Sequence, residues 1–322
     1  MTGTVLLFIL GLVLLIKGGD WFVDGATGIA HKFHIPEILI GATVVSIGTT
    51  LPEVMVSANS ALSGHGEIAY GNAIGSIICN TSLIAAITVT FKPALIERKT
   101  LYVPVAFFYG AFALYAGVAY VTGFFSRTIG IVLLLAFLLY MTLSVLDARK
   151  TMISEKNNPK EDEENINIIS KLVFLVVGAA VIAIGADLLV DNGIIIAKAL
   201  GVPEAVIGLT FVALGTSLPE FVTAITSLVK GHGALSLGNV IGANLFNLVL
   251  VSGVSTVLSP FPIPQSSAIN GINTSLIVDI PVVFFVMSLL LIPALLRGKL
   301  SRIQGILLLI TYTAFCAFQF TL

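Results

Sequence analysis

Uninterrupted apolar runs of about twenty residues recur along this chain, and no other feature limits its fold as strongly. A run of that length crosses the hydrocarbon core of a bilayer as an α-helix. A transmembrane barrel is excluded because its strands alternate polar and apolar residues, whereas these runs are continuous. Only 10% of the 322 residues are charged, too few to cover a water-soluble domain of this size. The sequence therefore predicts an all-α polytopic membrane protein.

We expect about ten transmembrane helices on the basis of length and hydropathy. Their ranges are 3–30, 36–62, 68–91, 101–122, 127–147, 170–199, 203–229, 234–257, 275–296 and 302–320. The only long charged stretch, at 147–171, separates five helices from five. The predicted organisation is a first transmembrane repeat at 1–147, a linker loop at 148–169 and a second, inverted repeat at 170–322.

The distribution of basic residues predicts the orientation. Thirteen lysines and arginines fall in loops on one side of the membrane, and only Arg127 and Lys198 fall on the other side. Cytoplasmic loops are enriched in lysine and arginine, so the 147–171 loop is predicted to be cytoplasmic and both termini outside. We expect a multi-pass protein of the plasma membrane, which is the inner membrane in a bacterial cell.

An internal repeat relates the two halves at a constant spacing of 167 residues. GATVVSIGTTLPE at 41–53 matches GLTFVALGTSLPE at 208–220, and GNAIGSIICN at 71–80 matches GNVIGANLFN at 238–247. Each repeat has five helices, an odd number, so the second begins on the opposite side of the membrane. Inverted repeats whose helices are interrupted at corresponding positions are typical of secondary transporters, and the substrate site lies at the repeat interface.

The paired phrases place a proline and a glutamate inside apolar helices. Pro52 and Pro219 lack an N–H and crowd the carbonyl four residues earlier, so we expect the helices to be interrupted there, with carbonyls turned outward. Glu53 and Glu220 are costly in a membrane and therefore indicate function. Carbonyls, hydroxyls and two carboxylates suit a hard cation such as calcium, and nitrogen and sulfur ligands for a softer metal are missing.

These phrases resemble the two alpha repeats of the cation/calcium exchanger superfamily, in particular its prokaryotic sodium/calcium exchangers. The motifs occupy 36–80 and 203–247, and the resemblance extends over essentially the whole chain. It implies an antiporter, not an enzyme, that exchanges calcium for sodium by alternating access. Calcium and sodium would be transported ions, and no cofactor or obligate protein partner is implied. The net charge of −1 argues against a nucleic-acid partner.

The resemblance also implies the ion ligands. Calcium would be held by Glu53 and Glu220 and by the backbone carbonyls of Thr49 and Thr216. One sodium site would use the Ser46 carbonyl, Thr50 and Ser76, and the opposite one would use the Ala213 carbonyl and Ser217. Asn80 would occupy the middle position, and Asn247 is its repeat equivalent. Asn72 and Asn239 are expected to form hydrogen bonds to ligands rather than to bind ions.

Two residues depart from the family's pattern. Sodium-coupled exchangers often have an aspartate where this chain has Asn247 and a serine where it has Ala243. A proton- or lithium-coupled cation exchanger is therefore a second interpretation. A cation channel is a third, although inverted repeats favour alternating access. An intramembrane enzyme is disfavoured because the helices carry no nucleophile and base at matching depth.

Overall fold

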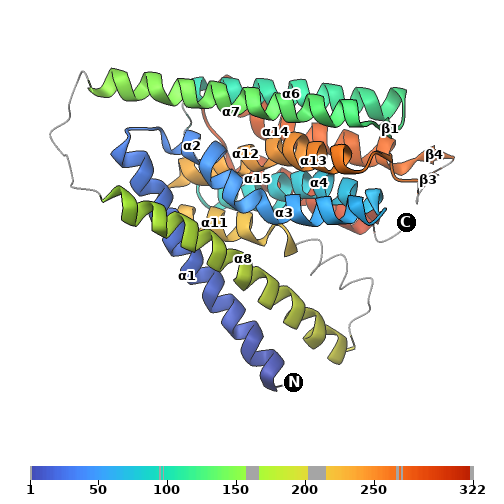
Figure 1. Ribbon diagram of the computed structural model, residues 1–322, viewed down its shortest axis with the longest axis horizontal. Coiled ribbons are helices and arrows are strands. Elements are labelled where there is room, and N and C mark those ends of the chain that lie inside the picture. Colours follow the sequence, from blue (N-terminus) through green and yellow to red (C-terminus); the bar gives the residue numbers. More distant parts are fainter. Residues whose placement is uncertain are drawn as a thin grey trace. The chain divides into compact units, whose positions relative to one another are not determined.

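The computed structural model describes residues 2–93, 96, 98–156, 167–201, 215–265, 268–269 and 271–319. Nine helices of this described part are long and apolar enough to cross a membrane, and Leu218–Val229 is a shorter apolar helix (Figure 1). They coincide with the ten predicted spans, except that the first part of the seventh span lies outside the described residues. The prediction of an all-α polytopic membrane protein is confirmed.

The first half of the chain contains helices and one short strand. They are α1 (Thr2–Lys32), α2 (Glu37–Ile40), η1 (Gly41–Val45), α3 (Ser46–Leu62), α4 (Gly66–Cys79), η2 (Asn80–Ala85), α5 (Ala86–Phe91), α6 (Arg98–Val121), β1 (Phe124–Phe125) and α7 (Arg127–Lys156). Here η denotes a π-helix.

The second half has the same helical character. Its described elements are α8 (Ile168–Ala199), α11 (Leu218–Val229), α12 (Gly233–Phe246), η4 (Asn247–Val251), α13 (Ser252–Leu258), β2 (Phe261–Pro262), β3 (Ala268–Ile269), β4 (Ile272–Asn273), η5 (Ser275–Asp279), α14 (Ile280–Arg297) and α15 (Arg302–Gln319). The strands form two small antiparallel pairs, β1 with β2 and β3 with β4.

The chain divides into two compact units, and each combines segments of both repeats. Unit 1 contains residues 1–49 and 143–239, and unit 2 contains residues 50–142 and 240–322. These boundaries fall within α3, α7 and α12 and differ from the predicted division around 148–169. The predicted division describes similarity between halves of the sequence, whereas the units describe which segments pack together, so the repeat boundaries remain a prediction.

Glycines bring α1 and α8 into close antiparallel contact within unit 1 (Figure 1). A Cβ atom on Gly11 would lie 2.8 Å from the Gly185 carbonyl oxygen, and one on Gly18 would lie 3.1 Å from the Gly178 carbonyl oxygen. Gly11 and Gly178 are repeat equivalents, as are Gly18 and Gly185. The two helices therefore meet around a local twofold relation, which is the arrangement an inverted repeat requires.

Unit 2 is held together by apolar and aromatic packing. The rings of Tyr115 and Phe125 lie 4.5 Å apart between centroids, and Tyr70 packs beside both. Gly305 lets α15 approach α5 closely, because a Cβ atom there would lie 2.7 Å from the Ala86 carbonyl oxygen. This close packing fixes the helices around Asn80 and Asn247, which are both buried.

Short π-helices interrupt the regular helices beside several predicted ligands. The hydroxyl of Ser46 donates to the Gly41 carbonyl at 2.7 Å, and that of Ser252 donates to the Asn247 carbonyl at 3.1 Å. The backbone N–H of each serine donates to the same carbonyl five residues earlier, which closes a π-turn at the end of η1 and η4 respectively. π-Helices are rare and often mark functional sites, and η2 and η4 begin at Asn80 and Asn247.

The interruption expected at Pro52 is not observed, because α3 continues from Ser46 to Leu62 with Pro52 inside it. The irregular backbone of this repeat lies earlier, in η1. In the second repeat Thr216 and Ser217 form a turn, and α11 begins with Pro219 in its first turn, where a missing N–H costs little. A proline removes only one donor, and membrane helices tolerate it when neighbouring groups satisfy the carbonyl.

Candidate ion-binding site

Two glutamates in the described part of the chain are fully buried, and burying a carboxylate has a large free-energy cost. Glu53 in α3 and Glu220 in α11 are both 0% exposed. Glu220 lies in the first turn of α11, where the positive end of the helix dipole stabilises a negative charge. Buried carboxylates otherwise require polar partners or a cation. Glu53 belongs to unit 2 and Glu220 to unit 1, so their surroundings are described separately.

In unit 1, Asn239 of α12 holds the first turn of α3. The hydroxyl of Thr49 donates to the Asn239 side-chain oxygen at 3.2 Å, and the hydroxyl of Ser46 donates to the Asn239 backbone oxygen at 3.0 Å. All three residues are buried. The carbonyls of Ser46 and Thr49 were the predicted sodium and calcium ligands of this repeat, so the structure brings these two residues together.

In unit 2, Asn72 of α4 holds the backbone at Glu53. Its amide nitrogen donates to the Glu53 carbonyl oxygen at 3.2 Å and to the Ser57 hydroxyl at 2.8 Å. The hydroxyls of Thr50 and Ser76, predicted for one sodium site, are both buried. Asn72 thus positions the helix that carries Glu53, in agreement with the role expected for it.

Asn80 and Asn247 are the buried amides with the least satisfied hydrogen bonding. Among the described residues, neither the nitrogen nor the oxygen of either side-chain amide has a hydrogen-bond partner. Leaving a buried polar atom unpaired costs about 1–3 kcal/mol. Such groups in a folded protein are explained when water or an ion binds them. Their amide oxygens are hard ligands, so both residues fit the cation-binding role predicted for them.

The remaining predicted ligands of the second repeat are only partly described. Thr216 and Ser217 form the turn that precedes α11, and Ser217 is buried with its carbonyl accepting from the Phe221 N–H at 3.0 Å. Ala213 lies outside the described residues. Ala243, which replaces the expected serine, is buried and contributes only a methyl group.

The comparison with known proteins decides the family. Residues 3–146 and 170–321 match the family described as sodium/calcium exchanger protein. The chain belongs to the sodium/calcium exchanger family. The match leaves out the central linker and covers both repeats, so the assignment of the paired phrases to this family is confirmed.

Several relatives of this exchanger-family chain match it over nearly their full length. It is 36% identical to an uncharacterized membrane protein of Methanocaldococcus jannaschii, covering 95% of this chain and 94% of that one. It is 32% identical to the sodium/calcium exchanger MaX1 of Methanosarcina acetivorans, covering 99% of both. Among solved structures, the sodium-calcium exchanger NCX_Mj soaked with sodium and strontium superposes with a TM-score of 0.81 at 34% identity, covering 98% of both chains.

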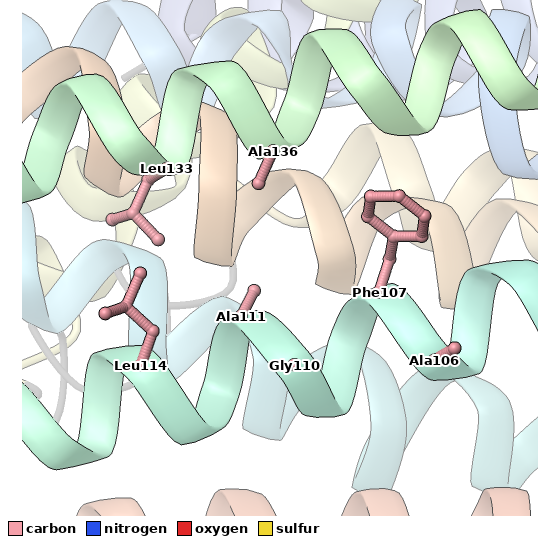
Figure 2. A pocket seen from close by; sticks show the side chains of 7 residues that line it. All are labelled: Ala106, Phe107, Gly110, Ala111, Leu114, Leu133 and Ala136. Atoms are coloured by element: carbon pink, nitrogen blue, oxygen red, sulfur yellow. The ribbon is translucent and has the colours of Figure 1, made fainter.

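An apolar groove between α6 and α7 has no part in ion binding. It has a volume of about 290 Å³ (Figure 2). Its lining consists of Ala106, Phe107, Gly110, Ala111, Leu114, Leu133 and Ala136. These side chains offer no oxygen ligand, so the groove does not suit a cation. In the part of the chain that the structure describes, no three histidine, cysteine, aspartate or glutamate residues gather as a metal cluster.

Sequence reasoning missed two polar contacts at one end of unit 1. Lys230 pairs with Asp24 at 2.8 Å and with Asp20 at 3.4 Å, and a nitrogen of His232 lies 2.7 Å from a carboxylate oxygen of Glu37. The partners lie about two hundred residues apart in sequence. In the sequence, these contacts are indicated only by the position of Lys230 and His232 together in one polar turn.

Proposed function

We propose that this protein is a secondary antiporter that exchanges calcium for sodium by alternating access. The observation that carries the proposal is the pair of fully buried glutamates, Glu53 and Glu220, at equivalent positions of two repeats. Two carboxylates balance one divalent ion or two monovalent ions, which is the charge relation that exchange requires. Membership of the sodium/calcium exchanger family and the names of its relatives support the same activity.

The proposed ligands are the residues that the sequence predicted. Calcium binds to Glu53 and Glu220 and to the carbonyls of Thr49 and Thr216. Sodium binds near the Ser46 carbonyl, Thr50 and Ser76, and on the other side near the Ala213 carbonyl and Ser217. Asn80 and Asn247 supply amide oxygens, and their unsatisfied amides among the described residues support this role. The reaction involves no covalent step and needs no catalytic residue or cofactor.

Two residues bear on the identity of the coupling ion. Asn247 is neutral where an aspartate would add a charge, and Ala243 offers no hydroxyl. On these two residues alone, an exchanger that couples calcium to protons or lithium is the second candidate, whereas the family match and the relatives named sodium/calcium exchangers favour sodium. Loading the vesicle interior with sodium, lithium, potassium or protons in turn separates the candidates, because only the coupling ion accelerates calcium uptake.

We further propose that the protein lies in the plasma membrane with the 147–171 loop in the cytoplasm and both termini outside. The excess of lysine and arginine on one side supports this orientation. The antiparallel contact of the repeat-equivalent helices α1 and α8 supports the inverted relation of the two repeats.

Replacing either buried glutamate by glutamine tests the proposed function. Glu53→Gln and Glu220→Gln each remove half of the negative charge and a bidentate ligand. Calcium-45 uptake into sodium-loaded proteoliposomes should fall by about a hundredfold or more, because a divalent ion then enters an under-compensated site. Glu67→Gln is the matched control, since Glu67 only accepts the Gln265 N–H and a glutamine oxygen preserves that bond. Near-normal calcium flux in either site variant would remove that residue from the site.

A further inference from the structure

Asn239 joins the two repeats within unit 1. It lies in α12 of the second repeat, whereas Ser46 and Thr49 lie in the first turn of α3 of the first repeat. The Asn239 side-chain oxygen accepts from the Thr49 hydroxyl at 3.2 Å and faces the Ser46 hydroxyl at 3.4 Å. The backbone oxygen of Asn239 accepts from the Ser46 hydroxyl at 3.0 Å. One residue of the second repeat thus contacts two proposed ligand residues of the first.

Two glycines permit this approach. A Cβ atom on Gly238 would lie 2.3 Å from the Ile38 carbonyl oxygen, and one on Gly41 would lie 2.5 Å from the Leu235 carbonyl oxygen. Real Cβ atoms do not make contacts this short, so the backbones of α12 and of the α2–η1 segment meet where no side chain intervenes. The contact between Asn239 and α3 is therefore built into the packing and is not a chance meeting of mobile side chains.

Hydrogen-bond accounting separates Asn239 from the ion ligands. The side-chain oxygen of Asn239 already accepts a hydrogen bond from the Thr49 hydroxyl, and the Ser46 hydroxyl, whose single proton is nearer the Gly41 carbonyl, lies 3.4 Å away. The amide nitrogen is a donor and does not bind cations. The side chain is fully buried, and within the described ranges its nitrogen has no hydrogen-bond partner. Asn80 and Asn247 differ, because both their amide oxygens remain available for an ion.

We propose that Asn239 is a positioning residue for calcium that acts through Thr49, and this inference rests on the proposed function of the site. Without its side chain, Ser46 keeps two acceptors, the Gly41 carbonyl at 2.7 Å and the Asn239 backbone carbonyl. Among the described residues, Thr49 then keeps only the Ser46 carbonyl at 3.5 Å, the outer limit of a hydrogen bond. The Thr49 side chain and backbone carbonyl are both attached to the same Cα atom. Releasing the hydroxyl therefore loosens the Thr49 carbonyl, which is the proposed calcium ligand.

The repeat equivalent of Asn239 is Asn72, which holds the backbone of its own repeat. Asn72 donates to the Glu53 carbonyl and to the Ser57 hydroxyl, and all three residues belong to the first repeat. The second-repeat equivalent of Ser57 is Ala224, which has no hydroxyl. The hydrogen bond from Asn72 to Ser57 therefore has no counterpart at Ala224 in the second repeat.

The test is a double-mutant cycle on the full-length protein in sodium-loaded proteoliposomes. Asn239→Ala and Thr49→Val each remove one side of the same hydrogen bond. Each should raise the KM for calcium by about three- to tenfold, the effect of one lost hydrogen bond, while the half-saturating sodium concentration changes by less than about twofold. The KM of the double variant should be no higher than that of the more strongly affected single variant, because both substitutions remove the same hydrogen bond.

Asn244→Ala is the matched control. Asn244 is also a fully buried asparagine of α12, and it donates to a threonine hydroxyl, that of Thr81, at 2.7 Å. Its replacement should lower thermal stability, leave the KM for calcium unchanged and add independently to Thr49→Val. If Asn239→Ala does not fold, comparing the calcium affinities of Thr49→Ser and Thr49→Val still tests the proposal. Serine keeps the hydroxyl and should recover most of the calcium affinity that valine loses.

Three outcomes overturn the proposal: additive effects in the cycle, an equal shift in sodium and calcium dependence, or no difference between Thr49→Ser and Thr49→Val. Equilibrium binding of calcium to the detergent-purified variants repeats the measurement without transport. A wild-type protein that binds calcium but shows no exchange would refute the antiporter function alone. The double-mutant cycle measured by calcium binding would then still test the positioning role of Asn239.

Discussion

Gly238→Ala should destabilise the protein and weaken calcium transport together. The added methyl group would lie 2.3 Å from the Ile38 carbonyl oxygen, and an ordinary contact begins at 3.4 Å, so the backbones must separate by about 1 Å. Overpacking of this kind costs about 1–3 kcal/mol. A shift of that size also takes the 3.0 Å bond between Ser46 and Asn239 beyond hydrogen-bonding range, which adds about 1 kcal/mol. The total loss is about 2–4 kcal/mol.

Thermal unfolding in detergent and calcium-45 uptake measure the two effects in the same preparation. Gly110→Ala is the control, because Gly110 lines the open groove between α6 and α7, is exposed, and a Cβ atom there meets no described atom within 4 Å (Figure 2). Alanine should stabilise that helix slightly, since glycine in a helix interior costs about 1 kcal/mol relative to alanine. The reasoning fails if Gly238→Ala unfolds at the wild-type temperature, or if it is destabilised but transports calcium with unchanged KM.

Two further predictions concern orientation and charge. A cysteine at Lys156 should resist an impermeant thiol reagent added to intact cells and react after the cells are opened, and labelling from outside would reverse the topology. If the sodium ions bound per cycle carry more charge than one calcium ion, exchange should respond to membrane potential, because one charge moved across 100 mV is worth about 2.3 kcal/mol. Calcium-45 uptake at potentials set by valinomycin and potassium measures this. Asn247→Asp should then increase the sodium dependence, and a rate indifferent to potential in both proteins would favour electroneutral exchange.

The fold could be predicted from sequence because the deciding quantity is local. The length and hydropathy of each apolar run fix a membrane helix without reference to any other segment. The predicted spans therefore agree with the described helices to within a few residues, apart from the end of α7 and the first part of the seventh span, which lies outside the described residues. Glu53 and Glu220 were found for a similar reason. A carboxylate inside an apolar run is conspicuous in the sequence alone, and its burial inside the protein keeps it away from lipid, where an exposed carboxylate would be costly.

The packing around those residues could not be predicted because it depends on segments far apart in sequence. Nothing near Thr49 indicates that its hydroxyl donates to a residue 190 positions away. The paired phrases contain recurring glycines, but the sequence does not say which of them leaves no room for a methyl group. The continuous helix at Pro52 illustrates the same limit, since whether a proline interrupts a helix depends on which neighbours satisfy the released carbonyl.

The departures from repeat symmetry bear on how an exchanger of this kind would divide its time between two orientations. Two identical inverted repeats would make the inward-open and outward-open states equal in free energy, so any preference must come from residues that differ between the repeats. Lys230 is one such residue, because it pairs with Asp20 and Asp24 while its first-repeat equivalent is Ser63. The pair is partly exposed and contributes less than about 1 kcal/mol, or about a fivefold change in populations. The Lys230 pair is therefore too weak to set the preference by itself, and the larger part must come from other residues that differ between the repeats.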